Sequence, residues 1–214
     1  MVKRLIFDLD NTLIMWKSSY KNALRSAITK HQIVSDDVLL DIVVDNYDSL
    51  IENYENYYNY YSKENMLELI NSRFHLNLNI SFIEDWLSEL NDMADVDNDV
   101  IDTLDYLSKK YELVILTNWF SSSQLARMKK VGIDKYFKEV YSGEKYIKPS
   151  IQSFKMAMGN NVANECIMIG DNYKIDIEGA INAGLDAIMV TSKDIESTDL
   201  YKVIHNIKEL KEML

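Results

Sequence analysis

The 214-residue chain has one cysteine, one proline and six glycines. The lone cysteine, Cys166, excludes an intramolecular disulfide and is compatible with a reducing compartment. No apolar run approaches the roughly 20 residues that a membrane-spanning helix needs. Asp8 interrupts the apolar N-terminal stretch too early for a signal peptide. These absences predict a cytoplasmic protein without a membrane segment.

Basic residues are also scarce, because 23 Lys and Arg stand against 34 Asp and Glu, which gives a net charge of -11. A chain this acidic is repelled by phosphate backbones, so we expect no nucleic-acid partner. A small anionic substrate could bind only where a local cation or a metal ion overrides the field. We therefore expect a small-molecule partner, and no feature of the sequence indicates an oligomeric state.

Short apolar runs that could form strands alternate with segments of helical spacing. The runs lie at residues 2–7, 113–116, 140–142, 166–169 and 187–190. Near-continuous apolar runs are typical of parallel strands covered on both faces. The segment "SSSQLARMKKVG" begins with capping serines and ends at a glycine, and "KIDIEGAINAGL" ends in the same way. We predict an α/β fold with a doubly wound parallel sheet, which "YKVIHNIKELKEML" closes with an edge strand and a helix.

Residues 15–91 contain neither proline nor glycine, and they show repeated helical patterning. Tyr47, Ile51, Tyr54, Tyr58 and Tyr61 recur at steps of three and four, which predicts one helix face that packs inside a bundle. We predict an all-helical cap domain at residues 15–92. It is inserted into a core domain formed by residues 1–14 and 93–214.

The stretch "LIFDLDNTL", residues 5–13, places two carboxylates, Asp8 and Asp10, directly after a buried strand. Like charges at close range repel each other, and an unpaired buried carboxylate is costly. A compensating positive charge must therefore be supplied from elsewhere in the fold.

Further polar residues follow the later strands, and one of them, Lys148, is a cation. They are Thr117, Asn118, Lys148, Asp171 and Asp176. The carboxyl ends of parallel strands converge on one crevice, so these side chains should gather around Asp8 and Asp10. Carboxylates at this spacing predict a Mg²⁺ site, and a lysine with a hydroxyl beside them predicts a phosphate pocket.

In this order, "DLDNT", "LTN", "KP" and "GDNYKID" resemble the four motifs of the haloacid dehalogenase (HAD) superfamily. The resemblance covers residues 3–190, and a helical insertion after the first motif is similar to members with a type 1 cap. It implies a Rossmann-like core and a hydrolase of the phosphatase branch. The substrate would be a small phosphomonoester, either a nucleoside monophosphate or a sugar or organic acid phosphate.

The resemblance also implies roles for individual residues. Asp8 matches the nucleophile that forms an aspartyl-phosphate, and Asp10 matches the general acid and base. Thr117 matches the phosphate-binding hydroxyl, and Asn118 beside it is a further candidate contact. Lys148 matches the lysine that steadies the phosphoryl charge.

The metal ligands implied by the resemblance are the Asp8 side chain, the main-chain carbonyl of Asp10 and Asp171. Asp176 matches a supporting carboxylate that acts directly or through water.

Asp10 discriminates among related activities. Dehalogenases of similar fold lack this second aspartate, and an alkoxide leaving group needs a proton whereas a halide does not. A phosphosugar mutase on the same residues is an alternative. A non-enzymatic phospho-acceptor signalling domain is a second alternative, although its phosphorylated aspartate would follow a middle strand.

Two tryptophans flank the motifs, Trp16 after the first and Trp119 after "LTN", where many relatives have glycine. They either stack on an aromatic leaving group such as a nucleobase or pack the core against the cap. Candidate cations for the substrate in or near the cap are Lys17, Lys21, Lys63 and Arg73.

Overall fold

The computed structural model describes residues 1–15, 17–34 and 37–214. In this described part of the chain, six parallel strands form one sheet in the order β3-β2-β1-β4-β5-β6. The strands are β1 (Arg4–Phe7), β2 (Glu112–Thr117), β3 (Glu139–Ser142), β4 (Cys166–Gly170), β5 (Asp186–Val190) and β6 (Lys202–Ile204). The predicted α/β class with a doubly wound parallel sheet is confirmed.

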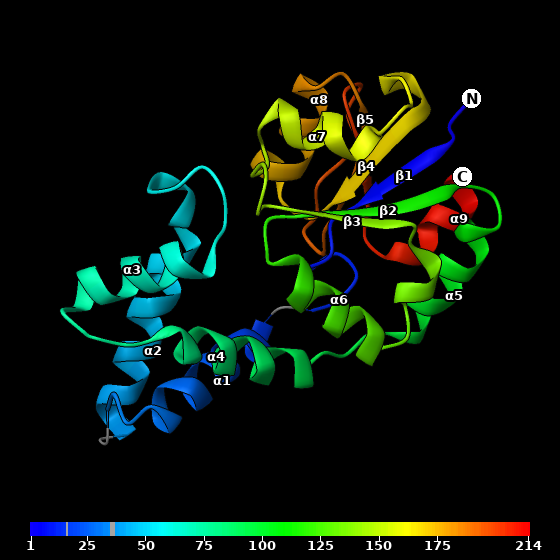
Figure 1. The fold of residues 1–214 in the computed structure, drawn as a ribbon. Helices are drawn as coiled ribbons and strands as arrows, with labels where there is room; N and C mark the ends of the chain where they lie inside the picture. Colours follow the sequence, from blue (N-terminus) through cyan, green and yellow to red (C-terminus); the bar gives the residue numbers. More distant parts are fainter. Residues whose placement is uncertain (16, 35–36) are drawn as a thin grey trace.

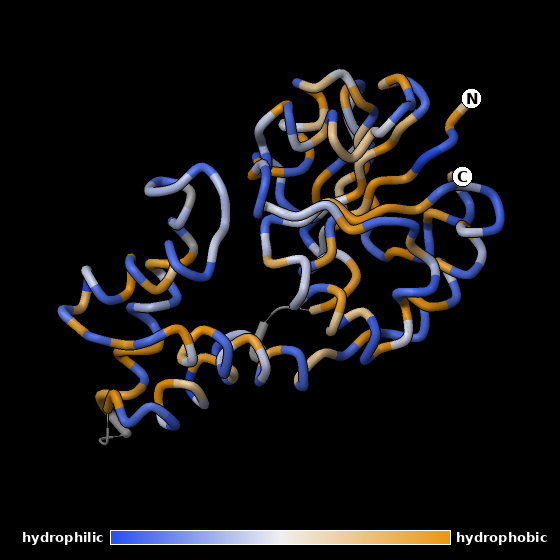
Figure 2. Tube along the Cα trace, viewed as in Figure 1, coloured by the Kyte–Doolittle hydropathy of each residue, from blue (hydrophilic) through white to orange (hydrophobic). Residues whose placement is uncertain are grey.

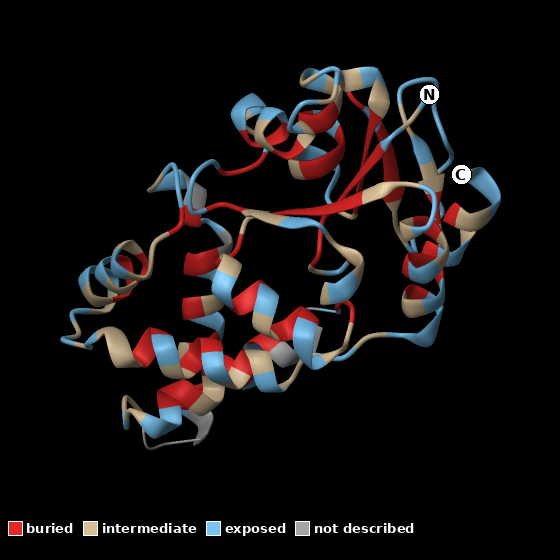
Figure 3. Ribbon diagram, turned by 45° about the vertical axis from the view of Figure 1, so that its right-hand side comes forward, coloured by how far each residue is buried: buried red, intermediate tan, exposed pale blue. Residues whose placement is uncertain are grey.

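Helices cover both faces of the sheet (Figure 1), which explains the near-continuous apolar runs. On β1, Leu5 and Phe7 face one layer, and Ile6 between them faces the other. The first layer contains α5 (Asn98–Ser108), α6 (Ser121–Lys130) and α9 (Leu210–Met213); the second contains α7 (Ile151–Met158) and α8 (Gly179–Asn182). The central strands are apolar in Figure 2 and buried in Figure 3.

The cap consists of α1 (Lys17–Lys30), α2 (Asp37–Glu52), α3 (Lys63–Phe74) and α4 (Ile80–Asp92). These helices share one hydrophobic cluster, which also takes in Trp119, Phe120 and Ile147 of the core. The helical cap is thus packed on the core rather than tethered to it. The domain boundaries at residues 14/15 and 92/93 remain a prediction.

The predicted tyrosine face is not one helix. Helix α2 ends at Glu52, and Tyr54 lies in a short 3₁₀ helix, η1 (Tyr54–Asn56), before an irregular segment. The Tyr54 and Tyr61 rings stack with centroids 4.2 Å apart, and both side chains are buried. The spacing identified four buried positions and the partly buried Tyr58, but packing of the rings rather than helical geometry brings Tyr54 and Tyr61 together.

The predicted capping serines of α6 do not cap it. The N-cap is Phe120, and the Ser121 N–H donates to Glu144 Oε2 at 2.7 Å. Ser123 Oγ donates instead to Asn91 Oδ1 near the end of α4, at 2.7 Å. A carboxylate from the loop after β3 therefore satisfies the helix start, and a serine hydroxyl joins α6 to the cap.

The remaining short elements are η2 (Asp134–Tyr136), η3 (Ala163–Glu165), η4 (Tyr173–Glu178) and η5 (Ile207–Glu209). The helix predicted in "KIDIEGAINAGL" is divided between η4, which is a π-helix, and α8, and Gly184 after it has φ +85°. No helix within the described ranges is both long and apolar enough to cross a bilayer.

Candidate active site

The site lies where the central strands end. Asp8 follows β1, Thr117 ends β2 and Asp171 follows β4. Phe7 pairs with Ile115 and with Ile169, so these strand ends lie in register. They open into a cavity of about 420 Å³ between core and cap. The predicted site residues that line it are Asp8, Asp10, Thr117, Asn118, Trp119, Lys148, Asp171 and Asp176.

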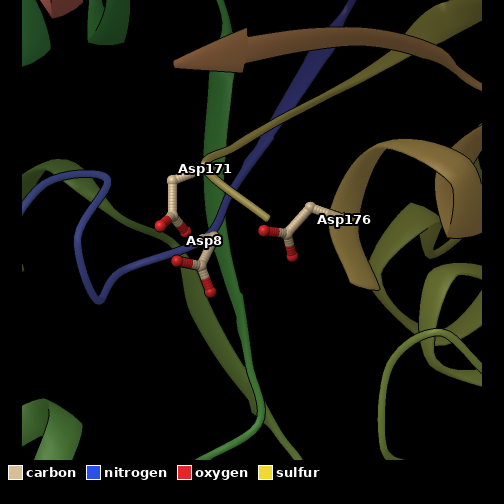
Figure 4. A group of neighbouring side chains, drawn as sticks. All are labelled: Asp8, Asp171 and Asp176. Carbon is tan, nitrogen blue, oxygen red and sulfur yellow. The ribbon is translucent and has the colours of Figure 1, made fainter. Parts of the chain in front are cut away.

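Three carboxylates converge within this cavity (Figure 4). Asp8, Asp171 and Asp176 each present an oxygen within 4.8 Å of the others. Asp8 and Asp176 are buried, and Asp171 is partly exposed to the cavity. Gly170 makes the approach possible, since a Cβ there would lie 2.5 Å from Asp176 Oδ2. Asp176 is also held by the Asn172 N–H, which donates to Oδ2 at 3.1 Å.

Lys148 is the buried cation of the site. Its Nζ donates to Asp8 Oδ1 and to Asp176 Oδ1, both at 2.7 Å. Burial lowers the pKa of Lys148, but the carboxylates of Asp176 and Asp8 outweigh it and raise the pKa overall. Lys148 therefore stays charged. One ammonium is thus bonded to two of the three carboxylates.

Burial, with repulsion between neighbouring carboxylates as a smaller cause, raises the pKa of two of these aspartates. Burial raises the pKa of Asp8 well above its usual value, although Lys148 opposes the shift. Burial and the neighbouring Asp176 raise the pKa of Asp171 to about 6. Oxygen ligands with a deficit of positive charge are the donor set that suits a hard divalent cation. The residues therefore fit such an ion.

The side chain of Asp10 lies apart from this group. Its Oδ2 accepts from Gln124 Nε2 at 2.5 Å, and its Oδ1 is ion-paired with Arg127. Gln124 Nε2 also donates to Thr117 Oγ1 at 2.9 Å, so one amide joins Asp10 to Thr117. Arg127 in turn donates to Gln124 Oε1 at 2.8 Å.

Sequence reasoning missed Gln124 and Arg127. Both are fully buried on α6, three residues apart and hence on one helix face. The signal available in the sequence was a glutamine and an arginine three residues apart in the helical segment that follows a site strand. The same pattern also fits an ordinary amphipathic helix, so it does not single out these two residues.

The other predicted contacts take specific partners. Asn118 Nδ2 donates to the Lys148 carbonyl at 2.9 Å, and the Lys148 N–H donates to Asn118 Oδ1 at 2.7 Å. The Asn118 amide thereby fixes the loop that carries Lys148. Thr12, which was not predicted, donates its hydroxyl to Asp8 Oδ2 at 3.2 Å.

Trp119 lines the cavity but is only 5% exposed. Its ring contacts Tyr20, Tyr61 and Trp86 of the cap, with centroids 5.7–6.0 Å away. These contacts favour the packing interpretation over stacking on a base. Trp16 lies outside the described residues.

Of the four candidate cap cations, Lys21 lines the cavity. Lys63, the first residue of α3, instead has its Nζ 3.8 Å from Glu84 Oε1 of α4, and Arg73 is in the last turn of α3. The side chain of Lys17 is outside the described part.

A model of the haloacid dehalogenase-like hydrolase family matches residues 5–190, which is most of the chain. The chain belongs to this family. The resemblance of the four motifs is thereby confirmed, and the chain is a haloacid dehalogenase-like hydrolase.

Relatives within the family include phosphatases. Glyceraldehyde 3-phosphate phosphatase of Methanothermobacter thermautotrophicus is 32% identical over 52% of this chain and 54% of that protein. The pyrimidine 5'-nucleotidase PynA of Streptococcus pneumoniae is 24% identical over 99% of this chain and 93% of its own length. The chain thus spans about half the length of the first relative and nearly all of the second.

Solved structures of the family share the whole fold. YfnB from Bacillus subtilis, a HAD-hydrolase bound to magnesium, superposes with a TM-score of 0.75 at 20% identity and covers 100% of this chain and 98% of its own. A HAD phosphatase from Thermococcus onnurineus gives a TM-score of 0.70 at 21% identity, covering 99% and 97%. The HAD core with its helical cap is therefore established for this chain.

Proposed function

We propose that this haloacid dehalogenase-like hydrolase is a Mg²⁺-dependent phosphatase of small phosphomonoesters. The observation that carries the proposal is the grouping of Asp8, Asp171 and Asp176 around Lys148, with Asp10 and Thr117 at the same strand ends. Relatives named as a sugar phosphatase and a nucleotidase support the class of reaction.

Asp8 is the proposed nucleophile. Lys148 and Thr12 each donate to one of its carboxylate oxygens, which fixes the plane of the group. An Asp8 oxygen forms a bond to phosphorus while the ester P–O bond breaks. Lys148 faces the phosphoryl charge, and the Thr117 hydroxyl lies where it can donate to a phosphoryl oxygen.

Asp10 is the proposed proton carrier. In the first step its carboxyl proton passes to the leaving ester oxygen. In the second step its carboxylate takes a proton from water, whose oxygen bonds to phosphorus as the bond to Asp8 breaks. Inorganic phosphate leaves, and Asp8 and the protonated Asp10 are restored. Gln124 holds Asp10 beside Thr117, and therefore beside the proposed phosphate position.

Asp8, Asp171 and the main-chain carbonyl of Asp10 are the proposed ligands of Mg²⁺, with Asp176 in support. When bound, Mg²⁺ would neutralise these carboxylates and polarise phosphoryl oxygens. A cytoplasmic location remains part of the proposal.

The test is release of inorganic phosphate from p-nitrophenyl phosphate and from a panel of natural phosphomonoesters. We expect turnover with Mg²⁺ and its loss in EDTA, since the carboxylates would then repel the phosphate. Asp8→Asn should lower the rate by at least about 10³-fold and abolish the covalent intermediate, because an amide is a poor nucleophile.

The exposed Asp105, replaced by Asn, is the matched control and should keep full activity. Full activity in EDTA would contradict the proposal. So would retention of phosphate on the protein or its transfer within a sugar without release, as the signalling and mutase alternatives require.

A further inference from the structure

The cavity extends beyond the reacting groups. Its volume of about 420 Å³ lies within the range of about 300–1,000 Å³ typical of small-molecule pockets. The cap contributes a second part of the lining, which consists of Tyr20, Lys21, Asp48, Ile51 and Tyr61. We call these five residues the cap wall. Asp8 and the cap wall line the same cavity, so the leaving group of an ester bound at Asp8 would lie within it, beside the cap wall.

The positive charge of Lys21 is already matched within the cap. Its Nζ lies 2.8 Å from Asp45 Oδ1 and 3.0 Å from Asp48 Oδ2. Hydrogen bonds to these two carboxylates raise the pKa of Lys21. One ammonium therefore stands against two carboxylates, and the group carries a net negative charge.

Of these two carboxylates, Asp48 is the one that lines the cavity. Its side chain is 14% exposed, whereas that of Asp45 is 69% exposed and does not line the cavity. Solvent and salt screen the charge of Asp45 more strongly. Asp48 therefore contributes an acceptor and a negative charge to the cap wall.

The other described cation in the lining is Lys148, and it too is held by two carboxylates. Among the lining residues that the structure describes, each lysine is thus matched by acidic groups. A bound Mg²⁺ and Lys148 would attract the phosphoryl group. A second anionic group on the substrate would be repelled by the carboxylate of Asp48.

Resting on the proposed phosphatase activity, we propose that the cap wall selects leaving groups that carry hydroxyl or N–H donors and no negative charge. Asp48 accepts a hydrogen bond from such a donor, and Ile51, Tyr20 and Tyr61 offer apolar and aromatic surface to its ring. The substrate class is a nucleoside or sugar monophosphate, in place of a phosphorylated carboxylic acid or a bisphosphate.

The test is competition against hydrolysis of p-nitrophenyl phosphate in the presence of Mg²⁺. Glycerol 3-phosphate and 3-phosphoglycerate are matched competitors, because a CH₂OH group in the first replaces a carboxylate in the second. The inhibition constant should favour glycerol 3-phosphate by about tenfold, as expected for one like-charge contact at partial solvent screening. Equal or tighter binding of 3-phosphoglycerate overturns the inference while leaving the phosphatase assignment intact.

Two variants locate the effect. Asp48→Asn should bring the ratio of the two inhibition constants close to one. Asp45→Asn removes the same charge from the same helix and the same lysine, but outside the cavity, and should leave the ratio within about twofold. An unchanged ratio in Asp48→Asn, or an equal change in both variants, overturns the role of Asp48.

Salt dependence tests the same inference on the wild-type protein. At about 1 M salt, where the Debye length is ~3 Å, the ratio of the inhibition constants of 3-phosphoglycerate and glycerol 3-phosphate should move toward one if charge repulsion causes it. A ratio that salt leaves unchanged overturns the electrostatic basis.

Uridine monophosphate and glucose 6-phosphate, as further competitors, distinguish a nucleoside from a sugar. The inference requires that at least one of them binds more tightly than 3-phosphoglycerate. If p-nitrophenyl phosphate itself is not hydrolysed, the phosphatase proposal fails and this inference fails with it.

Discussion

The cap wall and the core wall, by which we mean the core residues that line the cavity, such as Asp8, Lys148 and Asp176, hold their charges in different ways. On the core wall, the Lys148 side chain is 2% exposed and bonds to two carboxylates that are 9% and 2% exposed. On the cap wall, the Lys21 side chain is 49% exposed. Buried charges are held in one arrangement and are poorly screened, whereas exposed ones adjust and are weakened by salt. The core wall is thus suited to chemistry that needs fixed groups, and the cap wall to recognition of varied leaving groups.

The largest effect that would test this comparison is expected at Asp10 on the core wall. Asp10→Asn removes proton transfer, which typically contributes ~10²–10⁴-fold. The loss should be large with an alkyl ester and smaller with p-nitrophenyl phosphate, whose leaving group needs little protonation. The measurement is kcat/KM for both substrates. Equal losses would argue against Asp10 as the acid.

Gln124→Met sharpens the same prediction, because it removes the hydrogen bonds to Asp10 and Thr117 and keeps both residues. Since Thr117 is the proposed phosphoryl contact, its loss of support should lower activity with both esters to a similar extent. A loss confined to the alkyl ester would show that Gln124 supports Asp10 alone.

Trp119 is where the two walls meet, and we expect its replacement to weaken the whole molecule. Trp119→Ala opens a cavity among the rings of Tyr20, Tyr61 and Trp86. Removal of a buried aromatic ring typically costs about 3–5 kcal/mol of unfolding free energy. Urea denaturation should show this, and kcat/KM should fall for nucleotides and acetyl phosphate alike.

Trp119→Phe is the control and should retain most of the stability. If Trp119→Ala leaves the free energy of unfolding unchanged and lowers kcat/KM for nucleotides alone, the packing interpretation is wrong. That result would support stacking of Trp119 on a base.

The smallest effect is expected at Glu144, which joins the loop after β3 to the start of α6. Partial burial raises the pKa of Glu144, but hydrogen bonds from Ser121 and Ser142 outweigh it and hold the pKa below its usual value. A lowered folded-state pKa contributes stability above the unfolded-state pKa, and this contribution is lost as pH falls through the folded value.

Glu144→Gln should therefore lower the free energy of unfolding at neutral pH by roughly 1 kcal/mol or less, as is typical for charge at a helix start. The difference from wild type should vanish under acid. Thermal melts at neutral and acidic pH measure it. A difference that persists in acid would show that shape rather than charge matters at this position.

Sequence reasoning located Asp8, Thr117 and Asp171 because each stands at the end of an apolar strand. Parallel strands end at one edge, so Asp8, Thr117 and Asp171 had to converge whatever the helices did. The orientation of Asp10 was not predictable in this way, since it depends on Gln124 and Arg127 from a helix whose packing angle the sequence does not encode locally.

The cap was harder to predict. A spacing of three and four identified Tyr54 and Tyr61 as buried, but it also fits a chain that leaves the helix and stacks its rings. Likewise, serines at the start of α6 are good caps in isolation, and Glu144, 23 residues away from Ser121, takes that place through tertiary contact. Both errors arose where long-range contacts override local preference.

The Trp86–Trp119 pair gives the protein an intrinsic fluorescence signal at the boundary between cap and core. The two rings belong to α4 and to the loop after β2, and they meet edge to face at 5.7 Å across the boundary between cap and core. They are two of the three tryptophans in the chain. Any separation of cap from core would move both indoles into a new environment at once. Intrinsic fluorescence could then follow ligand-dependent closure in solution without an attached dye.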